Sequence, residues 1–152
     1  MIELIHQRQP TNNSCVSTCL AMLAGLPAEV VIATHQDDYF LRLRSPLAIM
    51  EDMGMMAVPL SSLSNVSCHE GCVYLVTVQS LNCAQTSHQI ILDCRHPDGY
   101  RIYDPQMGND GCRFYVPHFQ EDNCLEPLAV KFEGGWFADF RIFECPALGV
   151  IS

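Results

Sequence analysis

The chain has 152 residues, of which 49% are hydrophobic and 16% charged, and its formal net charge is −9. This composition is typical of a chain that folds around a core, and its length predicts a single domain over residues 1–152. With eight Lys and Arg against 17 Asp and Glu, we expect neither nucleic acid nor an anionic membrane surface as a partner, because both bind through cationic side chains.

The N-terminus has no basic stretch followed by an apolar run, so we expect no secretory signal peptide. No apolar stretch approaches the roughly 18 residues of a membrane helix. The nine cysteines are scattered, without the paired spacing of a disulfide framework. We therefore predict a reduced, cytoplasmic protein whose cysteines are mostly small buried hydrophobes. The alternative is an exported protein with some disulfides and no recognisable signal.

After an extended arm and loop over residues 1–13, the first helix is predicted over about 14–24. Its apolar residues recur at helical spacing, and either Asn13 or Ser14 can cap the free N–H groups of its first turn. Cys15 therefore lies in that first turn, where the N–H groups and the helix dipole favour a thiolate. A structural helix needs no thiol there, whereas a nucleophilic enzyme does.

Two further helices are predicted, each with a proline suited to a first turn. Pro27 precedes a short helix over Ala28–Thr34. A second helix lies between Ser45 and Gly54, with the serine as its cap, Pro46 just inside and the glycine just past its end. The first third of the chain is thus predicted to be helical.

From Met55 onward the pattern changes to that of β-strands. Val73–Val78 is β-branched and aromatic, as a buried strand is. His88–Cys94 and Gly99–Asp104 are predicted to form the arms of a hairpin, because Arg95–Gly99 supplies Pro and Asp-Gly turn residues. Further strands are expected at Arg113–Val116, Leu128–Phe132 and Phe140–Cys145. Helices followed by a run of antiparallel strands predict an α+β fold.

A cysteine nucleophile needs a base, a residue that orients the base, and donors for the oxyanion. His88 begins a predicted strand and Asp104 ends the paired arm, so an antiparallel hairpin brings the two side chains together. Asp104 can then hold the tautomer of the His88 imidazole. Gln9, six residues before Cys15, can donate its side-chain amide to the same oxyanion as the Cys15 backbone N–H.

This constellation resembles the papain-like cysteine peptidases, most closely those that process bacteriocin leaders at double-glycine sites in peptide exporters. The likeness covers about residues 7–108 and consists of Gln-x5-Cys opening an apolar helix, a His followed by aliphatic strand residues, and Tyr103-Asp104-Pro105-x-x-Gly108. The successive spacings from Gln9 through Cys15 and His88 to Asp104 are six, 73 and 16 residues.

The resemblance implies a papain-like fold, with N-terminal helices packed on a C-terminal antiparallel β-sheet. It also implies Cys15 as the nucleophile, His88 as the base, Asp104 as the orienting residue and Gln9 as the oxyanion donor. Where the family has Asp-Cys-Gly around the nucleophile, this chain has Ser14-Cys15-Val16.

The function expected on this basis is a stand-alone, thiol-dependent hydrolase that cleaves a peptide or amide bond of a peptide or protein substrate without a cofactor. Glutamine deamidases and transglutaminase-like enzymes use the same machinery and are the first alternative. A binding module that keeps the fold without the activity is the second. The intact set of four functional residues argues against the binding module.

Other residues are weaker candidates for the same roles. Cys19, one turn further along the same helix face, is expected to pack but is the alternative nucleophile. Gln7 rivals Gln9 only weakly because its spacing to the nucleophile is eight residues. Asp93 alternates within a strand and Asp98 belongs to the turn, so neither is favoured to orient a base. The histidines expected to be solvated at the surface are His6, His35, His96 and His118.

Cys68-His-Glu-Gly-Cys72 resembles half of a zinc site, but no second pair with close spacing supplies the other ligands. We therefore expect loop or strand-edge cysteines there and no metal site. Trp136 is expected to cap the core rather than to line a substrate cleft. The chain has no glycine-rich phosphate loop, so we expect no nucleotide chemistry.

Overall fold

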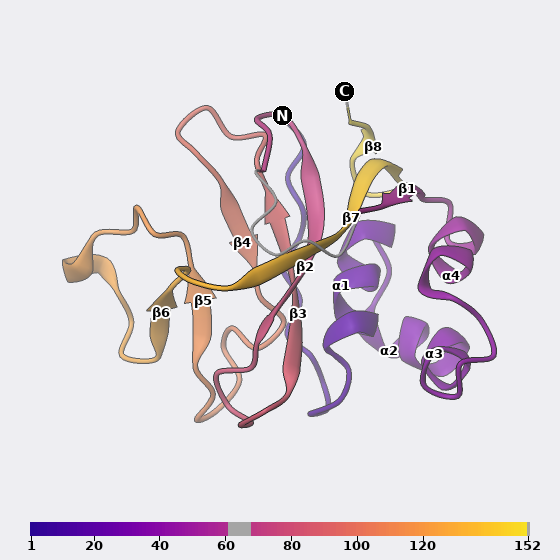
Figure 1. Cartoon of the computed structure of the whole chain (residues 1–152), viewed down its shortest axis with the longest axis horizontal. Helices are drawn as coiled ribbons and strands as arrows, with labels where there is room; N and C mark the ends of the chain where they lie inside the picture. Colours follow the sequence, from indigo (N-terminus) through magenta and orange to yellow (C-terminus); the bar gives the residue numbers. More distant parts are fainter. Residues whose placement is uncertain (61–67, 152) are drawn as a thin grey trace.

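The computed structural model describes residues 1–60 and 68–151 of the chain. Its α-helices precede the strands of the main sheet, which confirms the predicted α+β class. The helical elements of this first part are α1 (Cys15–Ala24), α2 (Ala28–Val31), the π-helical segment η1 (Ile32–Gln36), α3 (Asp37–Phe40) and α4 (Pro46–Asp52). They gather on one side of the sheet (Figure 1).

The main sheet is antiparallel throughout its described strands. Its strands are β1 (Met56–Pro59), β2 (Val73–Gln79), β3 (Ser87–Asp93), β4 (Arg101–Tyr103), β7 (Trp136–Cys145) and β8 (Gly149–Val150). They follow the order β1-β7-β2-β3-β4, with β8 paired to β7. The predicted hairpin is confirmed, because β3 and β4 pair antiparallel with Ile91 opposite Tyr103.

Two late strands do not join this sheet. β5 (Phe114–Val116) and β6 (Ala129–Lys131) pair with each other in parallel, and the short 3-10 helix η2 (Asp122–Cys124) lies between them. The expectation that these strands extend the antiparallel run was therefore wrong. Parallel neighbours need a crossover of about a dozen residues, and the connection through η2 supplies one.

The helices differ from the sequence predictions in two respects, the cap of α1 and the length of the helix after it. Ser14 precedes α1 as expected, but its hydroxyl exchanges hydrogen bonds with the backbone of Thr11 and closes the preceding loop instead of capping the helix. The helix predicted over Ala28–Thr34 continues through η1 and α3, because the chain inserts a π-helical segment where a break was expected. The Ser45 cap is confirmed, since its Oγ accepts a hydrogen bond from the backbone of Ala48 at 3.2 Å.

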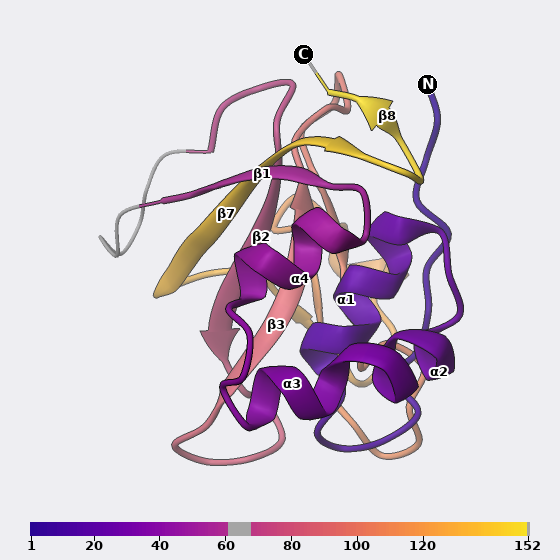
Figure 2. The ribbon, with the colours of Figure 1, turned by 90° about the vertical axis from the view of Figure 1, so that its right-hand side faces the viewer.

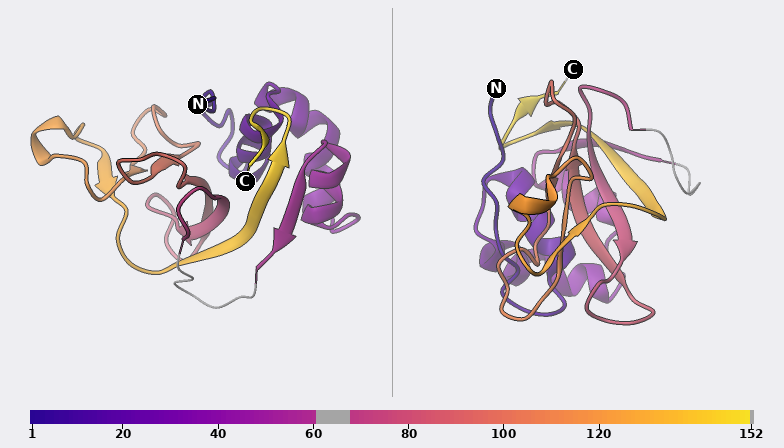
Figure 3. Two further views of the ribbon diagram at one scale, coloured as in Figure 1. Left: turned by 90° about the horizontal axis from the view of Figure 1, so that it is seen from above. Right: turned by 90° about the vertical axis from the view of Figure 1, so that its left-hand side faces the viewer.

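The two faces of the main sheet bury different clusters, because side chains alternate along each strand. Leu75 and Ile91 face the helices and belong to the same cluster as the apolar residues of α1. Ile90 and Leu92 face the opposite way and pack in a second cluster with Phe132. Figure 2 shows the helices stacked against the sheet, and Figure 3 shows β5 and β6 beyond β2 and β3 on the side away from the helices.

α1 is an interior helix rather than a surface one. Every residue from position 17 to 24 is buried, and the helix ends at Gly25, which adopts the left-handed conformation with a φ of 69°. The helix packs against β3, where the Sγ of Cys19 donates to the backbone oxygen of Gln89 at 3.4 Å. A buried helix holds its first residue in place, so this packing fixes Cys15 relative to β3.

None of the helices in residues 1–60 and 68–151 is both long enough and apolar enough to cross a membrane by itself. One pair of helical segments, Cys15–Ala24 and Ala28–Phe40, has the length and composition of a membrane span when the two are taken together, although the pair is bent by 114°.

Candidate active site

Cys15 is the first residue of α1 and lies at the wall of a cleft of about 720 Å³. Burial raises the pKa of its thiol, but a hydrogen bond to His88 and the charge of that ring bring the pKa below the usual value. The backbone N–H groups of Gln89 and Val16 lower it further. The start of the helix and the neighbouring strand therefore both favour the thiolate.

His88 lies near the start of β3 and is only 5% exposed. Its Nε2 forms a hydrogen bond of 2.7 Å with Oδ1 of Asp104. Burial alone lowers the pKa of a histidine, but the hydrogen bonds to Asp104 and Cys15 raise that of His88 to about 9. Because the pKa of Cys15 is lowered and that of His88 is raised, the pair favours the thiolate–imidazolium form.

Asp104 follows β4 directly and is 1% exposed. Its Oδ1 also accepts from the backbone N–H of Gln106 and its Oδ2 from that of Tyr115, both at 2.8 Å. The ring of His6 makes a hydrogen bond of 2.7 Å with its backbone oxygen. These contacts leave the carboxylate little freedom, so it can orient the imidazole of His88.

The structure thus brings Cys15, His88 and Asp104 together. The predicted hairpin had already implied that His88 and Asp104 lie side by side. The ring of His88 lies between its two partners and uses Nε2 for the carboxylate. Nδ1 is the ring nitrogen left to interact with the thiol of Cys15. A nucleophile, a base and an orienting carboxylate in this arrangement can form and resolve a covalent acyl intermediate.

Gln9 is 5% exposed and does not line the cleft within the described residues. Its backbone N–H donates to the oxygen of Pro105 at 2.7 Å, and its side-chain nitrogen donates to the oxygen of Thr11 at 2.9 Å. The second amide hydrogen of that nitrogen is not used by these contacts. The role of Gln9 as an oxyanion donor stays a prediction.

Gln7, the weaker rival of Gln9, has a different role. Its side-chain oxygen accepts from the backbone of Ala28 at 2.9 Å, and its side-chain nitrogen donates to Leu26 at 2.6 Å. Gln7 therefore fixes the turn between α1 and α2. Cys19 is fully buried, and burial together with the charges of Cys15 and Asp104 raises the pKa of its thiol well above the usual value, which disfavours it as a nucleophile.

The four histidines predicted to be solvated differ in exposure. His96 is buried, 6% exposed, with its Nε2 at 3.5 Å from Oδ2 of Asp93. His6, whose ring reaches the backbone of Asp104, and His35 are partly buried, whereas His118 is exposed. The prediction was wrong for His96, because it lies in an irregular segment that tertiary packing covers.

Sequence reasoning missed most of the cleft wall. Among the described residues, the lining contains no Asp, Glu, Lys or Arg, although the chain is strongly acidic. Asn82 joins two of the wall loops, because it donates to Gln106 at 2.7 Å and exchanges hydrogen bonds with the backbone of Arg113. The carboxamides and hydroxyls of the lining come from four segments: Asn12, Asn13, Tyr39, Thr77, Ser80, Asn82, Thr86, Ser87, Gln89 and Gln106. Val16, Phe40, Cys83, Gly111 and Cys112 also line the cleft. The polar stretches before Cys15 and before His88 were the available signal.

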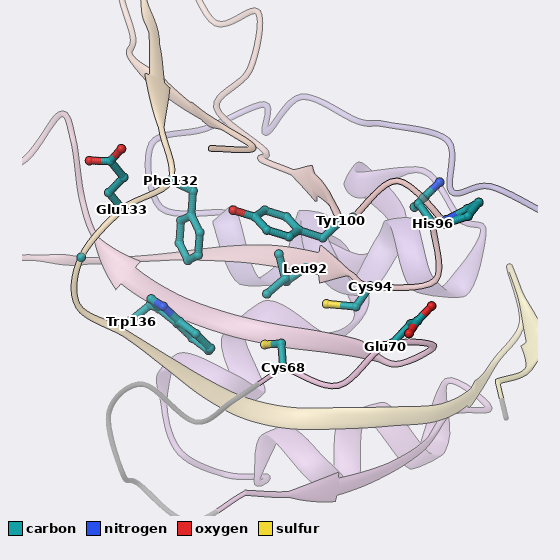
Figure 4. Close-up of a pocket in the computed structure, with 12 residues that line it drawn as sticks. Cys68, Glu70, Leu92, Cys94, His96, Tyr100, Phe132, Glu133 and Trp136 are labelled. Atoms are coloured by element: carbon teal, nitrogen blue, oxygen red, sulfur yellow. The ribbon is translucent and has the colours of Figure 1, made fainter. Parts of the chain in front are cut away.

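A second cavity, of about 610 Å³, opens on the sheet face away from the helices. Figure 4 shows the aromatic rings of Tyr100, Phe132 and Trp136 toward one end of it and the thiols of Cys68 and Cys94 beside Leu92. Trp136 packs against Phe132 with ring centroids 5.9 Å apart and is not among the described residues that line the catalytic cleft.

The two thiols of this second cavity interact with each other. Their mutual hydrogen bond, together with burial, raises the pKa of Cys68, and the same contact lowers that of Cys94. Within the residues that the structure describes, no three His, Cys, Asp or Glu side chains are grouped as a metal site requires.

Comparison of the chain with protein-family models, with curated proteins and with solved structures gives no match.

Proposed function

We propose that this protein is a thiol-dependent hydrolase of papain-like fold that cleaves a peptide or amide bond. The observation that carries the proposal is the buried ring of His88, which bonds to Asp104 and interacts with the thiol of Cys15 at the wall of an open cleft. Neither a buried structural cysteine nor a buried structural histidine needs the other two groups in this order.

In the proposed reaction the Cys15 thiolate attacks the substrate carbonyl carbon, and the carbonyl oxygen becomes an oxyanion. The backbone N–H of Cys15 and the side-chain amide of Gln9 are the proposed donors to that oxyanion. The imidazolium of His88 then gives its proton to the leaving amine as the carbon–nitrogen bond breaks. The product of this half-reaction is a thioester on Cys15.

Water resolves the thioester in the second half-reaction. Neutral His88 takes a proton from the water as the oxygen attacks the acyl carbon, and the Cys15 thiolate leaves. Asp104 keeps the ring oriented through both halves and stabilises its charged form. The cycle ends with the thiolate–imidazolium pair restored, and no cofactor enters it.

Deamidation of glutamine, or transfer of its acyl group to an amine, is the second candidate. The cleft wall supports it, because the carboxamides and hydroxyls of the lining can hydrogen-bond a neutral carboxamide as well as a peptide backbone. The third candidate, an inactive binding module of the same fold, has less support. Binding alone needs no thiol whose pKa is lowered by an oriented histidine.

The first test is hydrolysis of a peptide mixture, followed by mass spectrometry, with wild type and Cys15→Ala. We expect the variant to lose on the order of 10³-fold or more in kcat/KM, since no other group replaces the nucleophile. Cys19→Ala is the matched control on the same helix, and it should retain activity because Cys19 does not line the cleft. Equal activity of wild type and Cys15→Ala would contradict the proposal.

The same spectra separate the candidate functions. Backbone cleavage splits a peptide in two, whereas deamidation changes only the mass of one glutamine and transfer joins an added amine to it. Iodoacetamide labelling below neutral pH supplies an independent readout. Cys15 should react ahead of the exposed Cys83 and Cys124 because its pKa is lowered. Equal labelling of the three thiols, with no product in any spectrum, would favour the binding module.

A further inference from the structure

A smaller hollow of about 360 Å³ adjoins the catalytic cleft. The two share part of their walls, namely Val16, Tyr39, Thr77 and Gln89. Val16 follows Cys15 and Gln89 follows His88, so the hollow begins directly beside the two reacting side chains. A substrate bound over Cys15 can therefore place a neighbouring side chain in it.

One carboxylate, that of Asp139, lies in this hollow because β7 is irregular there. In the pairing of β2 with β7, Leu75 is opposite Phe140 and Val76 is opposite Ala138, so Asp139 is the extra residue of a β-bulge. Bulges re-aim side chains and are frequent beside active sites. In a regular strand the side chain of Asp139 would point to the face opposite those of Ala138 and Phe140. The bulge interrupts this alternation, so the side chain of Asp139 can point to the same face as one of them.

The carboxylate is held by neutral groups. Thr77 donates its hydroxyl to Oδ2 of Asp139, and the side-chain amide of Gln89 donates to the same oxygen at 3.4 Å. Asp139 takes part in none of the ion pairs found among residues 1–60 and 68–151. It is only partly exposed, so it is a partly desolvated carboxylate with one oxygen free of these contacts.

The rest of the hollow is largely apolar, and none of the residues from 1–60 and 68–151 that line it is Lys or Arg. Its walls come from α1, α3, α4, β2, β3 and β7 and include Leu20, Met50, Leu75, Phe137 and Phe140. A purely apolar guest would fill these walls but leave the carboxylate without a counter-charge. A guest with an aliphatic stem and a cationic tip satisfies both parts of the hollow.

We propose that this hollow is a specificity subsite for a lysine or arginine side chain of the substrate. The methylene stem packs against the apolar walls, and the ammonium or guanidinium pairs with Asp139. This inference rests on the proposed function, since it takes Cys15 as the reacting group. The substrates are then peptides with a cationic residue close to the scissile bond, and Asp139 recognises that residue.

The test compares two alkylating probes of equal length, an iodoacetamide carrying an aminopentyl group and one carrying a hexyl group. In each case the Cys15 thiolate displaces iodide, so the chemistry is the same and only the ammonium differs. The readout is the ratio of the two alkylation rates at Cys15, followed by mass spectrometry. In wild type we expect the cationic probe to react about five- to tenfold faster, as a partly desolvated ion pair allows.

Asp139→Asn should bring this rate ratio close to one, because the shape of the hollow is kept and the charge is removed. Glu126→Gln is the matched control. It changes net charge equally but lies between η2 and β6 and is not among the described residues that line the cleft or the hollow, so it should keep the wild-type ratio. Digestion of a peptide mixture should then show Lys or Arg enriched at one position from the cleaved bond in wild type and not in Asp139→Asn.

Several outcomes would overturn the subsite. Fast labelling of Cys15 with equal rates for both probes would do so while leaving the hydrolase proposal standing. A faster hexyl probe would assign the hollow to an apolar side chain. A cationic preference that Asp139→Asn retains would place the charge recognition elsewhere. Slow labelling of Cys15 by both probes would instead contradict the proposed function on which the subsite rests.

Discussion

β3 has a buried histidine and aspartate near each of its ends, and the two pairs differ in what the carboxylate does. At the start of the strand, Nε2 of His88 lies 2.7 Å from Oδ1 of Asp104. Past its end, Nε2 of His96 lies 3.5 Å from Oδ2 of Asp93 without forming a hydrogen bond. The first pair adjoins a reactive thiol, whereas the second lies near the cavity that contains Cys68 and Cys94 (Figure 4).

The remaining partners of each carboxylate explain the difference. Asp104 is held by backbone N–H groups, which carry no formal charge, so its negative charge acts on His88. Asp93 accepts two hydrogen bonds from the guanidinium of Arg95, at 2.9 and 2.8 Å, and its charge is neutralised there. A histidine beside a carboxylate is thus not a catalytic base by proximity alone. The other groups that bond to the carboxylate, neutral or charged, decide its role.

Of the changes that test the difference between these two pairs, the largest effect is expected from removing the charge that acts on His88. Asp104→Asn keeps the shape of the side chain, but an amide can stabilise the wrong tautomer and does not favour the imidazolium. We expect kcat to fall on the order of 10²- to 10⁴-fold with a smaller change in KM. Steady-state hydrolysis of a peptide identified in the digestion experiment measures both constants.

Asp93→Asn is the matched control at the other end of β3. It removes a carboxylate of equal burial beside a histidine, but one whose charge is already committed to Arg95. We expect reduced stability and a kcat close to that of wild type in the folded fraction. Equal losses of kcat in the two variants would mean that the two histidine–aspartate pairs do not differ in function.

The sequence was sufficient for the elements that local chemistry determines. Ser45, Pro46 and Gly54 bound α4 as predicted, and the turn chemistry of Arg95–Gly99 predicted the hairpin that brings His88 to Asp104. Short edge strands were missed: β1 is mostly exposed and ends in proline, and β8 has two residues. Neither is long enough to show alternation.

Features that depend on tertiary contacts could not be predicted. The bulge at Asp139 is set by the register of β7 against β2, which no local pattern in β7 reveals. The burial of His96 depends on segments distant in sequence, such as the N-terminal arm, whose Glu3 lies 3.9 Å from its ring. The polar wall of the cleft is likewise assembled from segments distant in sequence, and Asn82 contributed no motif of its own.

The next largest effect is expected at the ion pair of Asp93 with Arg95. Arg95→Met removes the partner of a fully buried carboxylate and leaves Asp93 as an unpaired charge. Removing one partner of such a pair costs about 3–5 kcal/mol in the free energy of unfolding. Urea unfolding followed by circular dichroism measures the loss, and His88 and Cys15 should still react as in wild type in the folded fraction.

Arg101→Met is the comparison for that measurement. Arg101 pairs at 3.0 Å with Asp98, but both side chains are more than a third exposed. Surface pairs of this kind contribute at most about 1 kcal/mol, so Arg101→Met should be well tolerated. A similar loss in the two variants would show that Arg95 stabilises the fold through its apolar stem rather than through its charge.

The smallest expected effect is in the pH dependence of hydrolysis, and it is the most specific to the pair of Cys15 and His88. His88 must be protonated to give a proton to the leaving amine, and Asp104 and Cys15 raise its pKa to about 9. Hydrolysis should therefore rise as pH increases through the lowered pKa of Cys15, and fall about tenfold per unit above pH ~9. Alkylation of Cys15 needs only the thiolate, so it should rise over the same acid range and then stay level.

Asp104→Asn sharpens this reading, because Asp104 supplies the hydrogen bond that contributes most to raising the pKa of His88. Without that contribution, the desolvation of a buried ring lowers the pKa, so the alkaline limb of residual hydrolysis should move to lower pH. The acid limb of Cys15 alkylation should move upward in the same variant, since a neutral ring no longer stabilises the thiolate. Parallel profiles in wild type and Asp104→Asn would mean that the carboxylate does not control the charge of His88, and the two ends of β3 would then be chemically equivalent.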